Sequence, residues 1–190
     1  MQKIVQVAAL SLLAITLAAG CRSAHSGAKA AKEDPAPKKL ADAGKYTISV
    51  LTDLGATEGL SASDMKQRQQ VRDGMGPDMV KILTQRGGFK AKEITARDQF
   101  KAGPDEYLLT IKIVKYNPGS KAARIVVGFG AGSCALDIHY ELFGAEKDPL
   151  LSKDDGVGSG LEWTRCVRKL NENMLSAING KLASQGQPAK

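Results

Sequence analysis

The chain has 190 residues and a formal net charge of +7, and it is long enough to bury one hydrophobic core. The charge is spread unevenly, since residues 46–190 hold 20 basic and 17 acidic side chains while residues 21–45 hold six and three. The long segment is therefore nearly balanced in charge, and half of the basic excess lies in residues 21–45.

Residues 1–20 predict a lipoprotein signal peptide. Lys3 precedes an apolar run over residues 4–19 that is too short and too rich in small residues for a transmembrane helix. The segment LAAGC, Leu17 to Cys21, resembles the lipobox of bacterial lipoproteins, in which the Cys becomes the acylated first residue of the mature chain. The alternative is an ordinary signal peptide with a Cys at this place by chance.

The residue after Cys21 bears on location. It is Arg22 rather than Asp, and by resemblance to sorting in bacteria with two membranes this implies the outer membrane, with the protein facing the periplasm. Acyl chains such as palmitate would anchor the protein without spanning the bilayer, since more than one chain makes the attachment stable. The lipid bilayer is therefore an expected partner, and export removes nucleic acid as one.

Residues 21–45 predict a disordered tether. They are mostly Ala, Lys, Ser and Pro, and they hold almost no large apolar side chain that could offset the entropy of ordering. Their basic side chains would add a weak attraction to anionic headgroups. The expected organisation is therefore a signal peptide over 1–20, a tether over 21–45, a folded domain over 46–183 and a disordered tail over 184–190.

Within the domain, the spacing of apolar residues predicts the elements in chain order. The predicted strands are residues 45–55, 89–95, 106–117 and 134–143, with one more short strand before a glycine-rich lead-in to the last helix. Residues 61–86 have a helical but interrupted pattern. Pro77 is expected near the N-terminus of a second helical segment, which Gly87 and Gly88 end.

The segment from Leu161 to Ser184 is the clearest helix. Its apolar residues recur at steps of three and four and form one stripe: Trp163, Cys166, Val167, Leu170, Met174, Ile178 and Leu182. We expect this stripe to pack across the sheet. The expected fold is α+β, with a single mixed, mainly antiparallel sheet of about four to five strands packed by two helices as a two-layer sandwich.

Gly128, Gly130 and Gly132 raise the question of a nucleotide site. A dinucleotide fingerprint needs a helix directly after its glycines, but the residues after Gly132 alternate as in a half-buried strand, and the Lys-Ser/Thr pair of a P-loop is missing. We therefore expect no nucleotide and no cofactor. Alternate glycines on a strand favour a structural role, by allowing a bend, a bulge or the close approach of another element.

Cys134 and Cys166 are a candidate disulfide. With Cys21 consumed by lipid, they form an even pair in an oxidising compartment, and each lies on the apolar side of its own element. The thiols would point into the same layer if the final helix packs across the strand. A bond closing a loop of about 30 residues would stabilise the fold by roughly 3–4 kcal/mol. The alternative is two separate buried thiols that behave as small apolar side chains.

Candidates for catalysis and metal binding are few. His25 lies in the tether, and His139 is five residues from Cys134 on the opposite strand face, so these two cannot form a catalytic pair. Asp137, His139 and Glu141 share one strand face at successive spacings of about 6.5–7 Å and could hold a metal, but a solvated strand face is the ordinary explanation. We expect no catalytic residue and no metal site.

Several features together resemble one bacterial family. They are the lipobox and tether, the helical segment ending in LTQRGGF, the strand YLLTIKIVKYNPG, and VVGFGAGSCALDIHYELF followed by GSG and a C-terminal helix. They resemble the lipoproteins described as domain of unknown function 4410, whose G-x-G-x-G segment usually ends in an acidic residue and a TGK-like turn. Here GAEKDPLL stands in place of that turn. The resemblance covers roughly residues 46–182 and implies a small periplasm-facing α/β domain on a lipid tether, with no reaction and no catalytic residues.

Two hypotheses from different classes remain. The favoured one is a non-catalytic binding or envelope-assembly module, held at the inner face of the outer membrane, that meets another envelope protein through its sheet edge or tether. The other is a ligand-binding protein or enzyme of the cell envelope with a site that the sequence does not show. A deep pocket with convergent polar groups would favour the second hypothesis, and a filled core with one bare edge would favour the first.

Overall fold

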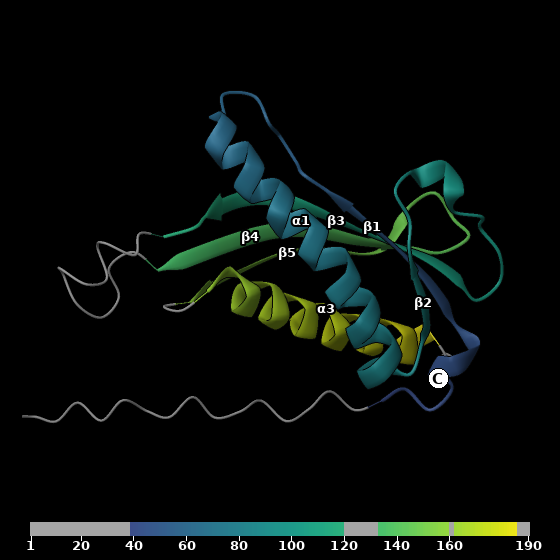
Figure 1. The fold of residues 1–190 in the computed structure, drawn as a ribbon. Helices are drawn as coiled ribbons and strands as arrows, with labels where there is room; N and C mark the ends of the chain where they lie inside the picture. The colour runs from purple at the N-terminus through teal and green to yellow at the C-terminus, as the bar shows by residue number, and fades with distance from the viewer. Residues whose placement is uncertain (1–38, 120–132, 160–161, 186–190) are drawn as a thin grey trace, which may run out of the picture. The chain divides into compact units, whose positions relative to one another are not determined.

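The computed structural model describes residues 39–119, 133–159 and 162–185. Within these ranges lie five strands and two long helices (Figure 1). The strands are β1 Thr47–Asp53, β2 Lys90–Glu93, β3 Glu106–Asn117, β4 Cys134–Phe143 and β5 Pro149–Ser159, and the helices are α1 Ala62–Ile82 and α3 Trp163–Gln185. The expected α+β class, with one mixed sheet and two helices, is confirmed. No helix in these ranges has the length and apolar character that crossing a bilayer requires.

The sheet has the strand order β2-β1-β3-β4-β5. β1 runs parallel to both of its neighbours, with Thr47 opposite Lys90 of β2 on one side and Glu106 of β3 on the other. β4 is antiparallel to β3 and to β5, and these two ladders are the longer ones, so most paired residues are antiparallel. Parallel neighbours need a crossover connection, and α1 supplies the one between β1 and β2.

One face of the sheet is covered by α1 and α3, which lie side by side in front of the strands in Figure 1. Alternate strand residues point into this layer, because successive side chains of a strand point to opposite faces. The buried strand residues on this face are Ile48, Val50, Leu109, Ile111, Ile113, Cys134, Leu136, Ile138, Tyr140 and Leu142. The predicted stripe of α3 meets them, since its apolar members from Cys166 to Leu182 are at most 2 % exposed.

The opposite face of the sheet is covered at one end only. Leu108 of β3 and Phe143 of β4 form a small second cluster there with Ile94, which follows β2. The short 3-10 turn η3, Arg97–Gln99, lies nearby, with the Arg97 guanidinium 4.4 Å from the centre of the Phe143 ring. Further along the strands this open face is mostly polar and at least partly exposed.

The helix α1 differs from the prediction, because it runs without a break over 21 residues and holds Pro77 in its interior. Its buried side continues in register across the proline: Arg68, Val71, Met75, Gly76, Met79 and Ile82. Pro77 is on the exposed side, where water can reach the Asp73 carbonyl that the proline leaves without its helical donor. A π-helical turn η2, Leu83–Gly87, follows, and Gly88 at φ 82° ends the helical segment as predicted.

Two boundaries also differ from the predictions. β5 is longer than the short strand expected, because it includes Gly156 and Gly158 of the glycine-rich lead-in. A Cβ at Gly156 would lie 2.5 Å from Asp137 Oδ1 on β4, so a larger residue there would require the Asp137 carboxylate to move. The folded part also starts before the predicted boundary at residue 46, because Ala43 of the 3-10 turn η1, Ala43–Lys45, is buried in the core.

Candidate functional site

Three groups of residues carry the sequence-based site predictions. The lipidation residue Cys21 and the glycine row of Gly128, Gly130 and Gly132 lie outside the described residues, and so does His25. The roles assigned to them stay predictions. The candidate disulfide pair lies within the described part of the chain and can be placed.

The structure brings Cys134 and Cys166 together between the sheet and α3. Cys134 begins β4 and Cys166 lies in the first turn of α3, and each residue is 1 % exposed. Their sulfur atoms are 3.4 Å apart, against about 2.05 Å in a disulfide, so both residues are thiols here. The helix therefore crosses the strand as the disulfide prediction requires, while the bond itself is not formed in this structure.

Tyr116 of β3 lies beside the two thiols. Burial raises the pKa of Tyr116 to about 12, and the neighbouring Cys134 and Cys166 act in the same direction. The phenol consequently stays neutral at physiological pH and brings no charge to the pair. The thiols are enclosed by an uncharged, largely apolar layer.

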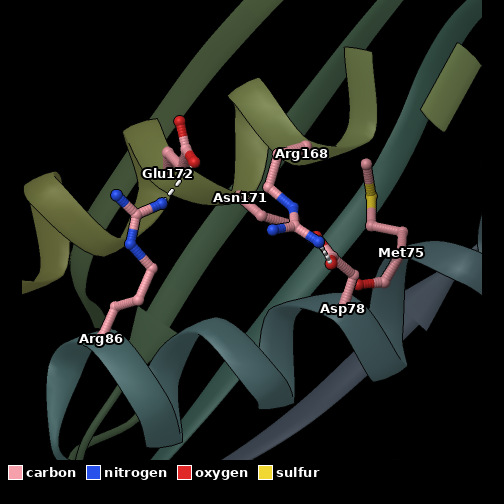
Figure 2. Close-up of polar contacts among 6 residues, drawn as sticks. All are labelled: Met75, Asp78, Arg86, Arg168, Asn171 and Glu172. Atoms are coloured by element: carbon pink, nitrogen blue, oxygen red, sulfur yellow. Dashed lines mark hydrogen bonds and ion pairs between the residues drawn. The ribbon is translucent and has the colours of Figure 1, made fainter. Parts of the chain in front are cut away.

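A polar clamp between α1 and α3 holds the helix that carries Cys166 (Figure 2). Arg168 of α3 forms an ion pair with Asp78 of α1 at 2.6 Å, and Asn171 Nδ2 donates to the other Asp78 oxygen at 2.9 Å. The same amide nitrogen is 3.3 Å from the Met75 carbonyl oxygen of α1. Because Asn171 is fully buried, these bonds satisfy a donor that would otherwise be costly to enclose.

A second ion pair extends the clamp along the two helices. Arg86 of η2 reaches across to Glu172 of α3, as the dashed line in Figure 2 shows. The clamp thus joins α1 and the η2 turn that follows it to the first half of α3, at one point each. We attribute the placement of Cys166 against β4 to this clamp together with the buried stripe of α3.

His139 is the second feature that the sequence analysis singled out. It lies on the open face of β4, where its Nδ1 is 2.8 Å from Asp154 Oδ1 of β5 and its Nε2 is 3.7 Å from Glu141 Oε1. Both ring nitrogens therefore face a carboxylate. The imidazole is one-third exposed, and the Asp154 side chain is 86 % exposed, so this group is a surface network.

Asp137, which shares the strand face with His139, is placed differently. Its carboxylate lies against Gly156 of β5, at the position that a side chain would otherwise fill. In the described ranges, no three His, Cys, Asp or Glu side chains are grouped so that they could hold a metal ion.

A depression of about 320 Å³ lies beside this network on the open face. Its lining residues are Val114, Asp137, Ile138, Asp154, Asp155 and Gly156. Val114 is a large apolar side chain that is 53 % exposed. The depression is open to solvent and is lined by three aspartates, so it is a shallow surface feature and not an enclosed pocket.

Arg68 is a buried charged side chain that donates hydrogen bonds to backbone carbonyl oxygens. Arg68 of α1 is 7 % exposed, and its Nη1 donates to the carbonyl oxygens of Leu54 at 3.1 Å and Ala56 at 2.7 Å. Its Nη2 is 3.4 Å from the carbonyl oxygen of Val114. Arg68 thus provides donors for backbone carbonyl oxygens both in the loop after β1 and in β3, where the register with β4 shifts.

Sequence reasoning missed two neighbours of the predicted sites. Asp154, the partner of His139, could have been found by pairing the predicted strand with the next one through the turn near Pro149. Tyr116 could not, because its position beside the thiols depends on the shift in register between Ile113 and Lys115.

Comparison with protein families gives one match. The family described as "Domain of unknown function (DUF4410)" matches residues 25–164. The chain belongs to this family. The family prediction is therefore confirmed, and it brings no reaction or catalytic residue with it. The comparison with curated proteins gives no significant match.

Solved structures with a similar arrangement are distant in sequence. A PelC dodecamer from Paraburkholderia phytofirmans is 11% identical, with a TM-score of 0.42 over 77% of this chain and 93% of that one. Protein XCC0632 from Xanthomonas campestris is 11% identical, with a TM-score of 0.44 over 78% and 95%. The uncharacterized lipoprotein B from Nitrosomonas europaea is 11% identical, with a TM-score of 0.35 over 80% and 99%. These values are too low to transfer a function or a residue role.

Proposed function

We propose that this protein is a lipid-anchored, non-catalytic module of the bacterial cell envelope. Cys21 carries the acyl chains, the outer membrane holds them, and the domain faces the periplasm and binds another envelope protein. The observation that carries the proposal is the segment from Leu17 to Cys21, in which an apolar run, an Ala-Gly pair and a Cys coincide.

The roles of the buried polar side chains support a non-catalytic module. Arg68 is used by backbone carbonyl oxygens, and Asn171 is used by the clamp between the two helices. The covered face of the sheet is filled by apolar side chains from both helices. Catalysis needs polar groups that converge on a substrate, and these groups are instead committed to holding the fold.

Cell fractionation tests the anchor. The Cys21→Ala variant has no thiol to acylate, so it should leave the membrane fraction and appear in the soluble periplasmic fraction. A variant that still pelleted with membranes in high salt would contradict the proposal, because high salt removes attachment by the basic tether.

A matched variant tests the choice of membrane. Arg22→Asp places an acidic residue after the lipidated Cys and leaves the rest of the chain unchanged. If sorting follows the rule that the resemblance implies, this variant should move to the inner membrane fraction while the original chain stays with the outer one. An unchanged distribution would contradict the outer-membrane assignment.

We also propose that Cys134 and Cys166 are bonded in the periplasm. The 3.4 Å separation of the sulfur atoms supports this, because it already brings the two atoms within about 1.4 Å of the length of a disulfide bond. Each thiol would lose one proton and one electron to a disulfide-exchanging oxidant of the envelope. The bond would tie the start of β4 to the start of α3.

Mass spectrometry after alkylation of the denatured, unreduced protein tests the bond. Neither Cys134 nor Cys166 should take up label, whereas a control sample that is reduced first should be labelled at both. Two labelled thiols in the unreduced sample from the periplasm would contradict the proposal.

A further inference from the structure

The outer edge of β5 is the longest unpaired strand edge in the part of the chain that the structure describes. β5 pairs with β4 along one side, and no described strand pairs with its other side. The opposite edge of the sheet is β2, which has four residues against eleven in β5. A long edge strand presents a row of backbone donors and acceptors that a further strand can pair with.

The order of charges along β5 makes the strand complementary to itself. A two-fold axis perpendicular to the sheet pairs β5 with β5 of a second copy in antiparallel fashion and keeps the helices of both copies on the same face. When the axis passes through Asp154, Lys153 of each copy lies opposite Asp155 of the other. Two cross-strand pairs of opposite charge then form on the helix-covered face.

Registers shifted by one residue in either direction do not pair opposite charges in this way. An axis through Lys153 sets the two Lys153 ammonium groups against each other, and an axis through Asp155 does the same with two carboxylates. Like charges directly opposite each other destabilise a strand pair. The register centred on Asp154 contains one pair of like charges, because Asp154 of one copy lies opposite Asp154 of the other. That side chain is 86 % exposed, and its Oδ1 lies 2.8 Å from His139 Nδ1.

Lys153 and Asp155 are available for such pairs. Neither has an ion-pair partner among the described residues. Asp155 is held in place, because Oδ1 accepts from the Gly156 N–H at 2.8 Å and Oδ2 accepts from Asn173 Nδ2 at 3.0 Å. A carboxylate has about four acceptor positions, so both oxygens can also accept from a lysine ammonium.

The apolar positions of β5 match in the same register. Leu151 lies opposite Val157 of the second copy, and both residues already pack against the edge of the core. Pairing would therefore continue the apolar layer from one copy to the next. On the open face, Ser152 lies opposite Gly156, beside which the Asp137 carboxylate lies.

We infer that two copies of this protein join edge to edge through antiparallel β5 strands, with Asp154 on the two-fold axis. The two sheets become one continuous sheet across the dimer. Both lipid anchors of the proposed function could then serve one assembly, but the pairing of β5 does not depend on lipidation.

Cysteine cross-linking of the full chain in detergent tests the register. In the Asp154→Cys variant the new thiols face each other across the axis, so mild oxidation should yield a disulfide-linked dimer. The matched control is Ser152→Cys, on the same face and also exposed, whose two copies would be about 13 Å apart in this register. Equal cross-linking of the two variants would overturn the inference, and the control also reports any linkage through the native cysteines.

Charge exchange tests the interaction itself, by sedimentation of the full chain over a range of concentrations. Lys153→Asp turns both opposite pairs into like pairs and should raise the dimer Kd by about tenfold. Adding Asp155→Lys to that variant restores opposite charges in reversed order and should bring the Kd back towards the original value. A chain that stays monomeric at every concentration, or a Lys153→Asp variant that dimerises as well as the original, would overturn the inference. A monomer would leave the β5 edge to a different protein.

Discussion

The two faces of the sheet share one backbone and differ in almost every other respect. On the covered face, residues such as Ile111, Ile113 and Ile138 are at most 1 % exposed and belong to one core cluster with residues of both helices. On the open face, their sequence neighbours are polar except for Val114, and within the described ranges apolar contacts seal only the end around Leu108. The difference teaches that stability is concentrated on one face, while the open face and the β5 edge are free to carry interactions.

The largest effect should come from the centre of the covered face. Ile111→Ala removes a side chain that is 0 % exposed and should lower the free energy of unfolding by about 3–4 kcal/mol, because the cavity cannot fully collapse. The matched control is Thr110→Ala, one residue away on the open face, which should cost no more than about 1 kcal/mol. Denaturant unfolding of both variants measures the difference, and similar losses would contradict the division between faces.

The next largest effect should come from the buried charge on the covered side. Arg68→Ala leaves the carbonyl oxygens of Leu54, Ala56 and Val114 without their donor, so the free energy of unfolding should fall by about 2–3 kcal/mol. Arg68→Lys keeps the charge but cannot reach three carbonyls at once, and it should recover only part of the loss. A full recovery with lysine would show that charge alone matters at this position.

A much smaller effect is expected at the polar network of the open face. His139→Ala removes the contacts with Asp154 and Glu141, which are surface interactions, and should change the free energy of unfolding by less than about 1 kcal/mol. Thermal unfolding at neutral pH measures the change. A loss as large as that of Ile111→Ala would mean that the open face is structural after all.

The smallest effect at neutral pH should be that of Tyr140→Phe. The Tyr140 hydroxyl is buried without a hydrogen-bond partner among the described residues, so its removal should change the free energy of unfolding by less than about 0.5 kcal/mol. At alkaline pH the free energy of unfolding of the variant should differ from that of the original chain. Burial raises the pKa of Tyr140 to about 12 from 10.0, so the unfolded chain releases this proton first.

The neutral tyrosine therefore contributes stability that is complete below pH 10 and is lost as the pH rises to about 12. Urea unfolding between these pH values should show a shallower decline for Tyr140→Phe than for the original chain. Equal slopes would contradict the assignment of the raised pKa to this residue.

The parts of the fold that the sequence predicted well are those with strict periodicity. β1, β3, β4 and α3 follow alternation or three- and four-residue steps closely, so their residues could be assigned from the pattern alone. α1 was misjudged because its buried side includes Arg68 and Gly76, which carry no apolar signal, and because Pro77 normally marks a helix start.

The length of β5 and the cysteine site were harder to predict for a different reason. The core side of β5 holds Lys153 and Asp155 in its middle, so the apolar alternation that marks a half-buried strand is missing there. The distance between Cys134 and Cys166 depends on where α3 crosses the sheet, which we attribute to the helix clamp together with the buried stripe of α3. Parity could place both thiols in one layer, but only tertiary packing could set the 3.4 Å between them.

The position of β1 between two strands that follow it in the chain constrains when the domain can fold. An N-terminal segment emerges first during synthesis, and β1 then has neither of its parallel neighbours beside it. Ile48 and Val50 must wait for β2, β3 and α1 before they can be enclosed, so the first half cannot fold ahead of the rest. The sheet of a chain with this order can therefore form only after β3 has been made.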